Sequence, residues 1–480
     1  MTGESSVATA SARISSFRDP AGALLTSDHG IFRRVSDQYA PVLREFLDSK
    51  TGRSLVDSGQ LIGTRWISED RFGVLSELIG EGDSIVEHDR VWFPSYAYEW
   101  PAEMLYAAGK LTIELAETAL KESFGLKDAT PYNVLFRGPN PVFVDVLSFE
   151  KREPGDATWL PYAQFLRMFI LPLLMSKHFG VGGTEIFLSH TDGYQPEEVY
   201  RRCNWARRLR PPFLTTISVP TWLSKRADPA SKSLYRPKQT DPEKAQFILE
   251  TQFRRLGKLL RKAKPAANRD SVWSSYMQTL SYSDEDFGRK SEIVGRWLAK
   301  LNPKTALDIG CNTGHFSALA ARAGARVVGI DADPAVVGST WERAVSENLD
   351  ILPLTVNLAR PTPASGWRNA EYPSFLDRAA GAFDVVMMLA VVHHLIVTER
   401  IPLTEVFSLA GELTTGYVIV EYVSKEDPMF QRLTRGREAL HADFTQESFE
   451  RQCRQRFTIV EKQDLKGQLR CLYLLRKNER

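Results

Sequence analysis

The chain has 480 residues, of which 43% are hydrophobic and 25% charged, so it can bury more than one core and form two to three domains. Its 61 basic and 59 acidic residues nearly cancel, which argues against a generic nucleic-acid binder. Four scattered cysteines lack metal-ligand spacing and disfavour a disulfide framework, so we expect a cytoplasmic protein.

We expect neither a signal peptide nor a membrane span. The longest apolar run, residues 165–175, is too short to cross a bilayer and is interrupted by Arg167 and Pro172. The first 25 residues are rich in Ser, Ala, Thr and Gly, a composition typical of a mobile tail. Residues 26–240 are expected to form an α+β domain that ends where Lys, Ser, Pro and Asp cluster over residues 225–240.

One pattern in this N-terminal half has chemical spacing. Asp128 is followed five residues later by Asn133, and Asp145 ends a predicted β-ribbon. The segment resembles the catalytic loop and metal-binding strand of protein kinases and aminoglycoside kinases, in which such residues converge on a phosphate-bound metal. The resemblance implies a kinase-like domain that takes ATP and Mg, or a degenerate module kept for recognition or as a scaffold.

The chain departs from the kinase pattern in several places. No glycine-rich phosphate loop lies near the start, no lysine pairs clearly with a glutamate, and Val146 replaces the expected glycine-bearing continuation. In the alternative interpretation, Asp128 and Asn133 cap turns and Asp145 ends a strand. The aromatic segment 92–101 lies where a kinase-like fold has its hinge, and it is equally a candidate acceptor-binding surface.

A helix is predicted from Asp241, a good N-cap followed by proline at the first helical position, to Pro265, which ends it. Four apolar residues give this helix one buried face: Leu249, Phe253, Leu256 and Leu260. Basic side chains line the opposite face, either simply solvated or facing an anionic ligand.

The most informative segment follows. Residues 305–309 read as a buried strand, Gly310 and Gly314 form a turn, and residues 316–323 read as a helix. A second strand, residues 326–330, leads into Asp331, where a carboxylate can accept hydrogen bonds from a ribose diol. Such a βαβ unit suits a nicotinamide dinucleotide or S-adenosylmethionine.

Two features favour S-adenosylmethionine. The dinucleotide turn needs three glycines around a pyrophosphate, whereas this turn has two, with Cys311, Asn312 and Thr313 between them. Asp308, just before the first glycine, would attract an ammonium group and repel a phosphate.

These residues resemble the first motif of the class I S-adenosylmethionine-dependent methyltransferases, acidic-x-Gly-x-x-x-Gly. Residues 328–334 are similar to the second motif, and residues 383–395 to the fourth strand with its following helix. The resemblance covers about residues 285–480, and we place the methyltransferase domain at residues 291–480. It implies a Rossmann-like α/β fold with a seven-stranded sheet that is closed by an antiparallel pair, residues 458–462 and 471–475.

The resemblance also implies cofactor contacts. Asp308 and the glycine turn would hold the methionine part, and Asp331 the ribose. Asn357, which follows the third strand, stands where the family often has an acidic residue near the adenine. The complete expected cofactor set is Asp308, Gly310, Cys311, Asn312, Gly314, Asp331, Ala332, Asn357, Leu389, Ala390, Tyr276 and Tyr282. Residues 241–290 are expected to form a helical linker and a lid, in which the two tyrosines stack on the adenine or acceptor, or pack between domains.

Methyl transfer needs an aligned nucleophile and a group that removes its proton. His393 and His394 follow the fourth strand at the carboxyl edge of the sheet and are candidate general bases toward a hydroxyl group. Glu421, at the end of the fifth strand, would orient a histidine or contact the acceptor. His441 and Asp443 form a further candidate pair on a loop. The C-terminal half has no convincing carboxylate cluster, so we predict no catalytic metal there.

Three functions remain open: a methyltransferase with an N-terminal recognition domain, a bifunctional kinase and methyltransferase, and a non-catalytic scaffold that binds the cofactor. The arrangement of both halves resembles bacterial methyltransferase-domain proteins that include nodulation-associated ones. This resemblance implies a glycan or small-metabolite hydroxyl as acceptor. The oligomeric state and the choice between oxygen and nitrogen stay open.

Overall fold

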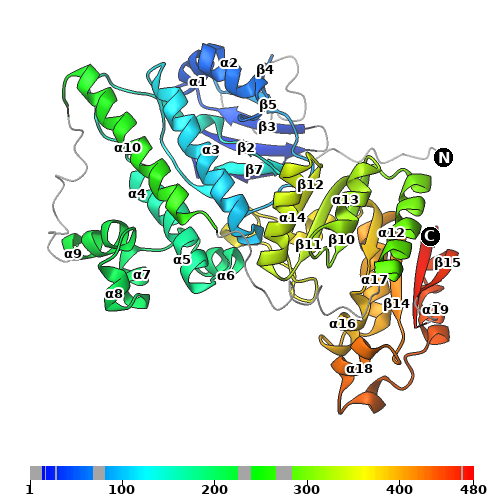
Figure 1. Ribbon diagram of the computed structural model, residues 1–480. Coiled ribbons are helices and arrows are strands. Elements are labelled where there is room, and N and C mark those ends of the chain that lie inside the picture. Colours follow the sequence, from blue (N-terminus) through cyan, green and yellow to red (C-terminus); the bar gives the residue numbers. More distant parts are fainter. Residues whose placement is uncertain are drawn as a thin grey trace, which may run out of the picture.

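The computed structural model describes residues 13–16, 18–27, 30–68, 82–224, 239–265, 284–465 and 469–479. The expected composition boundary at residues 225–240 therefore lies almost entirely outside the described residues. Two sheets organise the molecule, one in each half of the sequence (Figure 1). No helix in the described part of the chain combines the length and apolar character that a membrane crossing requires.

The N-terminal half begins with a five-stranded antiparallel sheet in the order β1-β2-β3-β5-β4. Its strands are β1 (Arg13–Ser16), β2 (Gly22–Ser27), β3 (Gly30–Val35), β4 (Thr64–Ile67) and β5 (Ser84–His88). Helices α1 (Ala40–Asp48) and α2 (Lys50–Asp57) come between β3 and β4. The half is thus an α+β arrangement, as expected, while its likeness to kinases stays a prediction.

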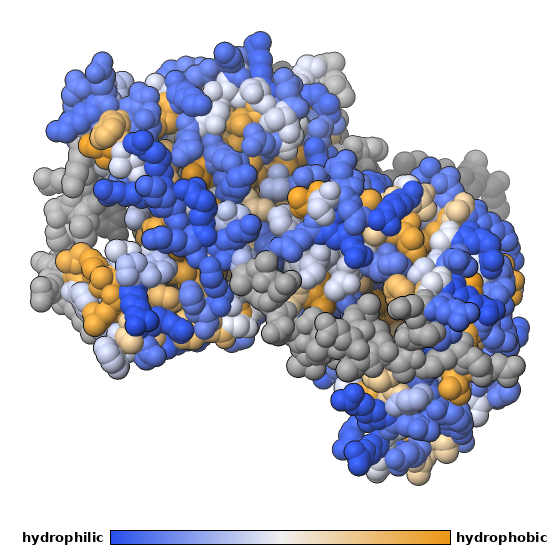
Figure 2. All heavy atoms as spheres, in the orientation of Figure 1, coloured by the Kyte–Doolittle hydropathy of each residue, from blue (hydrophilic) through white to orange (hydrophobic). Residues whose placement is uncertain are grey.

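Helices and two small hairpin-like ladders complete this half. The helices are α3 (Ala102–Leu120), α4 (Tyr162–Phe165), α5 (Leu171–Phe179), α6 (Gly183–Ser189), α7 (Pro196–Arg202), α8 (Trp205–Arg208), α9 (Val219–Ser224) and α10 (Pro242–Ala263). The ladders pair β6 (Phe124–Leu126) with β9 (Phe149–Lys151), and β7 (Val134–Arg137) with β8 (Asn140–Phe143). Short 3-10 helices are η3 (Ala97–Glu99), η4 (Pro131–Asn133) and η5 (Val146–Ser148), and two π-helical segments are η6 (Leu166–Ile170) and η7 (Leu214–Ser218). Exposed apolar side chains gather over the α7–α9 corner (Figure 2) and include Trp205 and Leu223.

The C-terminal half is built on a seven-stranded sheet in the order β12-β11-β10-β13-β14-β16-β15. Its strands are β10 (Thr305–Ile309), β11 (Arg326–Asp331), β12 (Ile351–Thr355), β13 (Phe383–Met388), β14 (Thr414–Val423), β15 (Phe457–Leu465) and β16 (Arg470–Lys477). The first five strands in the sheet order are parallel, and β16 and β15 add an antiparallel pair. The expected seven-stranded sheet and its closing pair are confirmed.

Helices cover both faces of this sheet. They are α12 (Asp284–Leu301), α13 (His315–Arg322), α14 (Pro334–Ser346), α15 (Phe375–Ala379), α16 (Val392–Val397), α17 (Leu403–Leu413), α18 (Pro428–Thr434) and α19 (Gln446–Cys453), with short turns η9 (Trp367–Asn369) and η10 (Glu438–His441). On one face, Trp297 of α12 and Ala318 of α13 pack on alternate residues of the central strands, including Ala306 and Val385. The intervening strand residues belong to the core on the other face, which α16 and α17 cover.

The two halves share one hydrophobic core. Phe93 from the N-terminal half lies 5.9 Å from both Phe375 and Phe383, measured between ring centres. A buried polar cluster seals the same interface: Arg378 forms an ion pair with Glu99, and the Thr362 hydroxyl donates to that carboxylate at 2.5 Å. The aromatic segment 92–101 is therefore largely buried between the halves and does not form an exposed acceptor surface.

Helix α10 lies alongside α3 and also packs on α5, both of which belong to the N-terminal half (Figure 1). Its predicted apolar residues Leu249, Phe253, Leu256 and Leu260 are all buried, against that half instead of over the methyltransferase-like sheet. The expectation that residues 241–290 act as one linker and lid is therefore not met over α10. The second part of that segment enters α12, which packs on the sheet.

Candidate functional site

The turn after β10 lies at the carboxyl edge of the parallel strands. The N–H groups of Gly310 and Cys311 donate to the Ile330 carbonyl oxygen at 2.8 and 3.0 Å, which fixes the turn against β11. Gly310, Asn312 and Gly314 have positive φ angles of 74°, 49° and 75°. Most residues with a side chain rarely adopt this left-handed backbone, whereas glycine and asparagine do so more readily. The path of the turn into α13 therefore explains which residues occupy these three positions.

Gly314 is required by packing as well as by its φ angle. A Cβ atom built there would lie 2.6 Å from Thr340 Cγ2 on α14. The Thr340 hydroxyl donates to the Asn312 carbonyl oxygen at 2.7 Å and so holds α14 against the turn. The space at Gly314 is thus filled by the protein itself, whereas a Cβ at Gly310 would meet only Val391, at 3.4 Å.

Asp331 ends β11 beside this turn. Its Oδ2 accepts a hydrogen bond from the Asn312 N–H at 3.1 Å, and its Oδ1 accepts from the Asp333 N–H at 3.0 Å. Burial raises the pKa of Asp331, although these backbone hydrogen bonds oppose the rise. Each carboxylate oxygen has a second lone pair, so the group can still accept hydrogen bonds from a ligand diol.

Asp308 lies deeper, on the face of the sheet that α12 and α13 cover. It is 2% exposed, and its Oδ2 accepts a hydrogen bond from the Ser317 hydroxyl at 2.6 Å. Burial raises the pKa of Asp308 to about 6, against the effects of Ser317 and of the Lys290 ammonium. Its direct neighbours are thus protein groups, and no local sequence pattern pairs Asp308 with Ser317.

The remaining expected cofactor residues are distributed around the same edge. Cys311 is buried, and its Sγ lies near Gly329, so its side chain packs in the interior. Ala332 is exposed next to Asp331, and the Asn357 side chain accepts from the Ala359 N–H at 2.9 Å. Leu389 is buried at the end of β13, and Ala390 has a positive φ angle of 55°. The two tyrosines of the expected lid, Tyr276 and Tyr282, lie outside the described residues.

Two histidines occupy the start of α16, at the carboxyl edge next to β13. Their ring centres are 4.3 Å apart. His393 is 2% exposed, and neither of its ring nitrogens has a hydrogen-bond partner among the described residues. Burial lowers the pKa of His393 well below its ordinary value, and it lowers the pKa of His394 to about 4, with the charge of Arg470 acting in the same direction. Both imidazoles are therefore neutral at physiological pH.

Glu421 is fully buried, and its negative charge opposes the fall in the pKa of His393. Its Oε2 lies 2.5 Å from the Lys290 Nζ, and its Oε1 accepts from Arg470 at 3.1 Å. The carboxylate is therefore engaged by two cations. Lys290 and Arg470 are not among the predicted site residues, although Arg470 directly precedes the apolar run 471–475.

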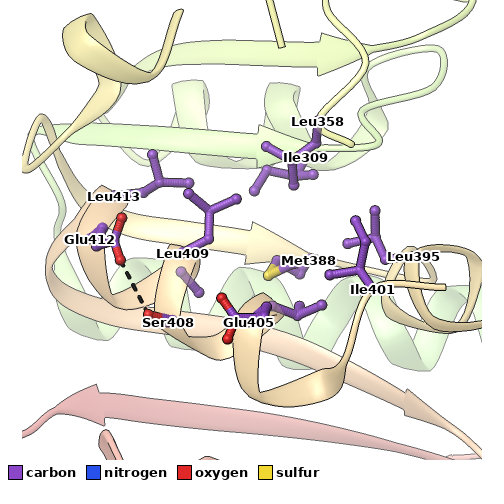
Figure 3. Close-up of a pocket in the computed structure, with 12 residues that line it drawn as sticks. Ile309, Leu358, Met388, Leu395, Ile401, Glu405, Ser408, Leu409, Glu412 and Leu413 are labelled. Atoms are coloured by element: carbon purple, nitrogen blue, oxygen red, sulfur yellow. Dashed lines mark hydrogen bonds between the residues drawn. The ribbon is translucent and has the colours of Figure 1, made fainter. Parts of the chain in front are cut away.

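The other face of the sheet holds a cavity of about 240 Å³ (Figure 3). Ile309 and Met388 point into it; they alternate with Asp308 and Met387 along their strands and so face away from the α12 side. The lining is mostly apolar, with Glu405, Ser408 and Glu412 contributed by α17. This cavity lies across the sheet from Asp308.

In the N-terminal half, Asp128 lies near Asp145. Burial raises the pKa of Asp128, and the negative charge of Asp145 raises it further. The Arg33 guanidinium, however, donates to Asp145 Oδ1 at 2.8 Å, and both side chains are largely buried. Asn133 Nδ2 is buried without a partner among the described residues. Those residues contain no group of three or more His, Cys, Asp or Glu side chains able to hold a metal. Because Arg33 already neutralises Asp145, the structure lends no support to the expected Mg site, which stays a prediction.

The C-terminal half is similar to a known protein family. Residues 282–470 match the family model described as a methyltransferase domain, and this match spans the seven-stranded sheet. Over 480 aligned residues the chain is 29% identical to nodulation protein NoeA of Rhizobium meliloti (strain 1021). The alignment covers 97% of this chain and 96% of that protein.

Two solved structures align with part of the chain. One is magnesium protoporphyrin IX methyltransferase from Synechocystis PCC 6803 with bound SAH, which is 16% identical in sequence. The alignment covers 44% of this chain and 90% of that chain, with a TM-score of 0.31. The other is N-methyltransferase NodS from Bradyrhizobium japonicum WM9, which is 17% identical in sequence. The alignment covers 41% of this chain and 100% of that chain, with a TM-score of 0.30.

Proposed function

We propose that the protein is an S-adenosylmethionine-dependent methyltransferase that methylates a hydroxyl group of a glycan or small metabolite. The observation that carries the proposal is the convergence, within a methyltransferase domain, of the glycine turn, Asp331 and the His393–His394 pair at one edge of the sheet. In open α/β sheets, ligands bind in the crevice at this edge, where the strand order reverses. Here the reversal lies between β10 and β13.

The residues of this edge fit the proposed cofactor. Asp331 keeps lone pairs for a ribose diol, and Asp308 supplies negative charge behind the turn, where a cationic ligand is favoured. The glycine turn presents backbone instead of side chains to the crevice. When bound, S-adenosylmethionine supplies an electrophilic methyl group on a sulfonium. The adenine contact expected at Asn357 remains part of the proposal.

The chain's own contribution to the reaction is alignment and proton removal. A neutral imidazole accepts a proton from a hydroxyl group as that oxygen attacks the methyl group in line. His393 and His394 are kept neutral by burial and by Arg470, and His393 is almost fully shielded from water. His393, with both ring nitrogens unpartnered in the described structure, has donor and acceptor capacity for an acceptor group.

The glycan or metabolite class rests on the likeness to a nodulation protein. The scaffold alternative would bind the cofactor without turnover. The kinase alternative gains no support from the Arg33–Asp145 ion pair, because the second carboxylate is already neutralised.

Calorimetry with S-adenosylhomocysteine tests the cofactor site. Asp331→Asn should weaken binding about 10- to 100-fold, the range for hydrogen bonds to a charged group. Asp333→Asn removes the same charge two residues away and keeps a good N-cap on α14, so its affinity should stay within about threefold of wild type. Equal affinities for all three proteins, or no binding by wild type, would refute the assignment.

Methyl transfer from labelled S-adenosylmethionine to a panel of oligosaccharides and small polyols tests the acceptor. His393→Gln and His394→Gln should each lower the turnover rate by about 100-fold at saturating cofactor. Two fully active variants would remove both histidines from the mechanism. Cofactor binding without methylation of any acceptor would favour the scaffold alternative.

A further inference from the structure

Four charged side chains in the interior of the methyltransferase domain form one continuous series of ion pairs. Lys290 pairs with Glu421, Glu421 with Arg470, and Arg470 with Asp427, and the side chains are 4%, 0%, 1% and 0% exposed in that order. Arg470 holds Asp427 with two donors, Nε to Oδ2 at 2.8 Å and Nη2 to Oδ1 at 3.2 Å. Two positive and two negative charges balance, and we call this series the charge relay.

One end of the charge relay lies beside the glycine turn. Lys290 is on α12, and its Nζ is 4.9 Å from the centre of the Phe316 ring, two residues after Gly314. The neighbouring Ser291 hydroxyl lies 2.8 Å from His315 Nε2, at the first residue of α13. The Lys290 charge also acts on Asp308. The position of Lys290 is therefore set by the same elements that form the proposed cofactor site.

The other end lies on the acceptor side. Asp427 caps α18: its Oδ1 accepts from the Met429 N–H at 2.9 Å. Helix α18 packs against α16, which carries His393 and His394. The chain from α18 to Phe444, residues 428–444, borders this side of the site, and we call it the cover segment.

Few contacts anchor the cover segment to the sheet. Phe430 stacks on Phe444 with ring centres 5.4 Å apart, and Phe444 lies at the same distance from Tyr422 of β14. Most of residues 435–443 are exposed. The bidentate pair between Arg470 and Asp427 is the strongest directional contact at its start, because two parallel hydrogen bonds fix orientation as well as distance.

Buried ion pairs add little net stability, since the cost of removing the charges from water offsets their attraction. Their clearest effect is to specify one arrangement. We propose that Arg470 is a positioning residue that couples the two sides of the site: through Glu421 and Lys290 it responds to cofactor bound at the glycine turn, and through Asp427 it orders the cover segment over the acceptor. This inference rests on the proposed function, because it takes the cofactor to bind at that turn.

Hydrogen–deuterium exchange of the full chain, with and without S-adenosylhomocysteine, tests the coupling. In wild type, the ligand should slow exchange of peptides from residues 428–444 at least tenfold. The double variant Arg470→Met with Asp427→Asn removes one ion pair and keeps the charges of Lys290 and Glu421 balanced. It should bind the ligand within threefold of wild type and show less than a twofold slowing in the cover segment.

A matched control removes a buried ion pair elsewhere. Glu99→Gln with Arg378→Met also preserves charge balance but lies at the interface between the halves, so the tenfold slowing should persist. If the first double variant does not fold, Arg470→Lys keeps the charge without the bidentate geometry and should reduce the slowing at least threefold. Ligand binding with equal slowing in wild type and the Arg470 variants would overturn the charge relay alone. A wild type that does not bind the ligand would overturn the proposed function as well.

Discussion

The buried carboxyl group of Asp308 makes a quantitative prediction about stability and pH. Its side chain is almost fully removed from water, and Ser317 donates the hydrogen bond at 2.6 Å that is its nearest compensation. Asp308→Asn replaces the ionisable group with a neutral one of the same shape. The variant should therefore gain stability relative to wild type as the pH rises.

The magnitude follows from the pKa. Burial raises the pKa of Asp308 from its ordinary value of 3.8 to about 6. Because the folded protein binds this proton more tightly than the unfolded chain, the contribution to stability is full below pH 3.8 and is lost as the pH rises through 6. At about 1.4 kcal/mol per pH unit, ionisation costs about 3 kcal/mol above pH 7. About half of that cost develops between pH 5 and pH 7.5.

Urea unfolding of wild type and Asp308→Asn at pH 5, 6, 7 and 7.5 measures this difference. The free energy of unfolding of the variant, relative to wild type, should increase by about 1.5 kcal/mol across that range. Asp37→Asn, on an exposed site of the N-terminal half, serves as the matched control and should change stability by no more than about 0.5 kcal/mol. A difference between Asp308→Asn and wild type that stays constant with pH would refute the reasoning.

The other predictions concern the histidines, the glycine turn and the N-terminal half. Because the folded pKa of His394 is depressed to about 4, its contribution to stability is present above pH 6.5 and lost as the pH falls toward 4. His394→Gln should therefore reduce the loss of stability on the acid side by up to about 3 kcal/mol, which thermal unfolding at pH 4.5 to 7 measures. Gly314→Ala should destabilise the protein by about 2 to 3 kcal/mol, because it combines a left-handed φ with a clash on Thr340. The control Gly381→Ala, with a φ of 61° and no atom within 4 Å, should cost only about 1 kcal/mol, and equal losses would show that the clash contributes nothing. ATP with magnesium should leave the unfolding temperature unchanged, and a magnesium-dependent rise that Asp145→Asn abolishes would restore the kinase alternative.

The parallel sheet was readable from the sequence because each strand is a short buried run next to a turn or helix signal. The strand predicted at residues 305–309 is β10 to the residue. Local periodicity also found the buried face of α10. It did not identify the elements that pack on that face, because an amphipathic pattern predicts which side of a helix is buried but not which element covers it.

The same limit applies to the site. Asp308, Asp331 and the two histidines could be found because their positions relative to strand ends are local properties. The charge relay joins residues up to 180 positions apart, and no local pattern pairs Lys290 with Glu421 or Arg470 with Asp427. Glu421 was expected to act near the histidines because it ends a predicted strand at the right edge. Its charge does act on His393, but its pairing with Lys290 of α12 could not be predicted from that position.

The interface between the halves bears on where an acceptor can bind. Burying Glu99 and Arg378 would leave an uncompensated charge in either half alone, and Phe93 fills the space beside Phe375 and Phe383. The N-terminal half is thus part of the same folded unit and not a separate recognition module on a flexible linker. Since segment 92–101 is largely buried in this interface, we expect the proposed acceptor to approach the C-terminal half from the side of α16 and the cover segment. That route passes the His393–His394 pair, which ties the acceptor's path to the groups proposed to remove its proton.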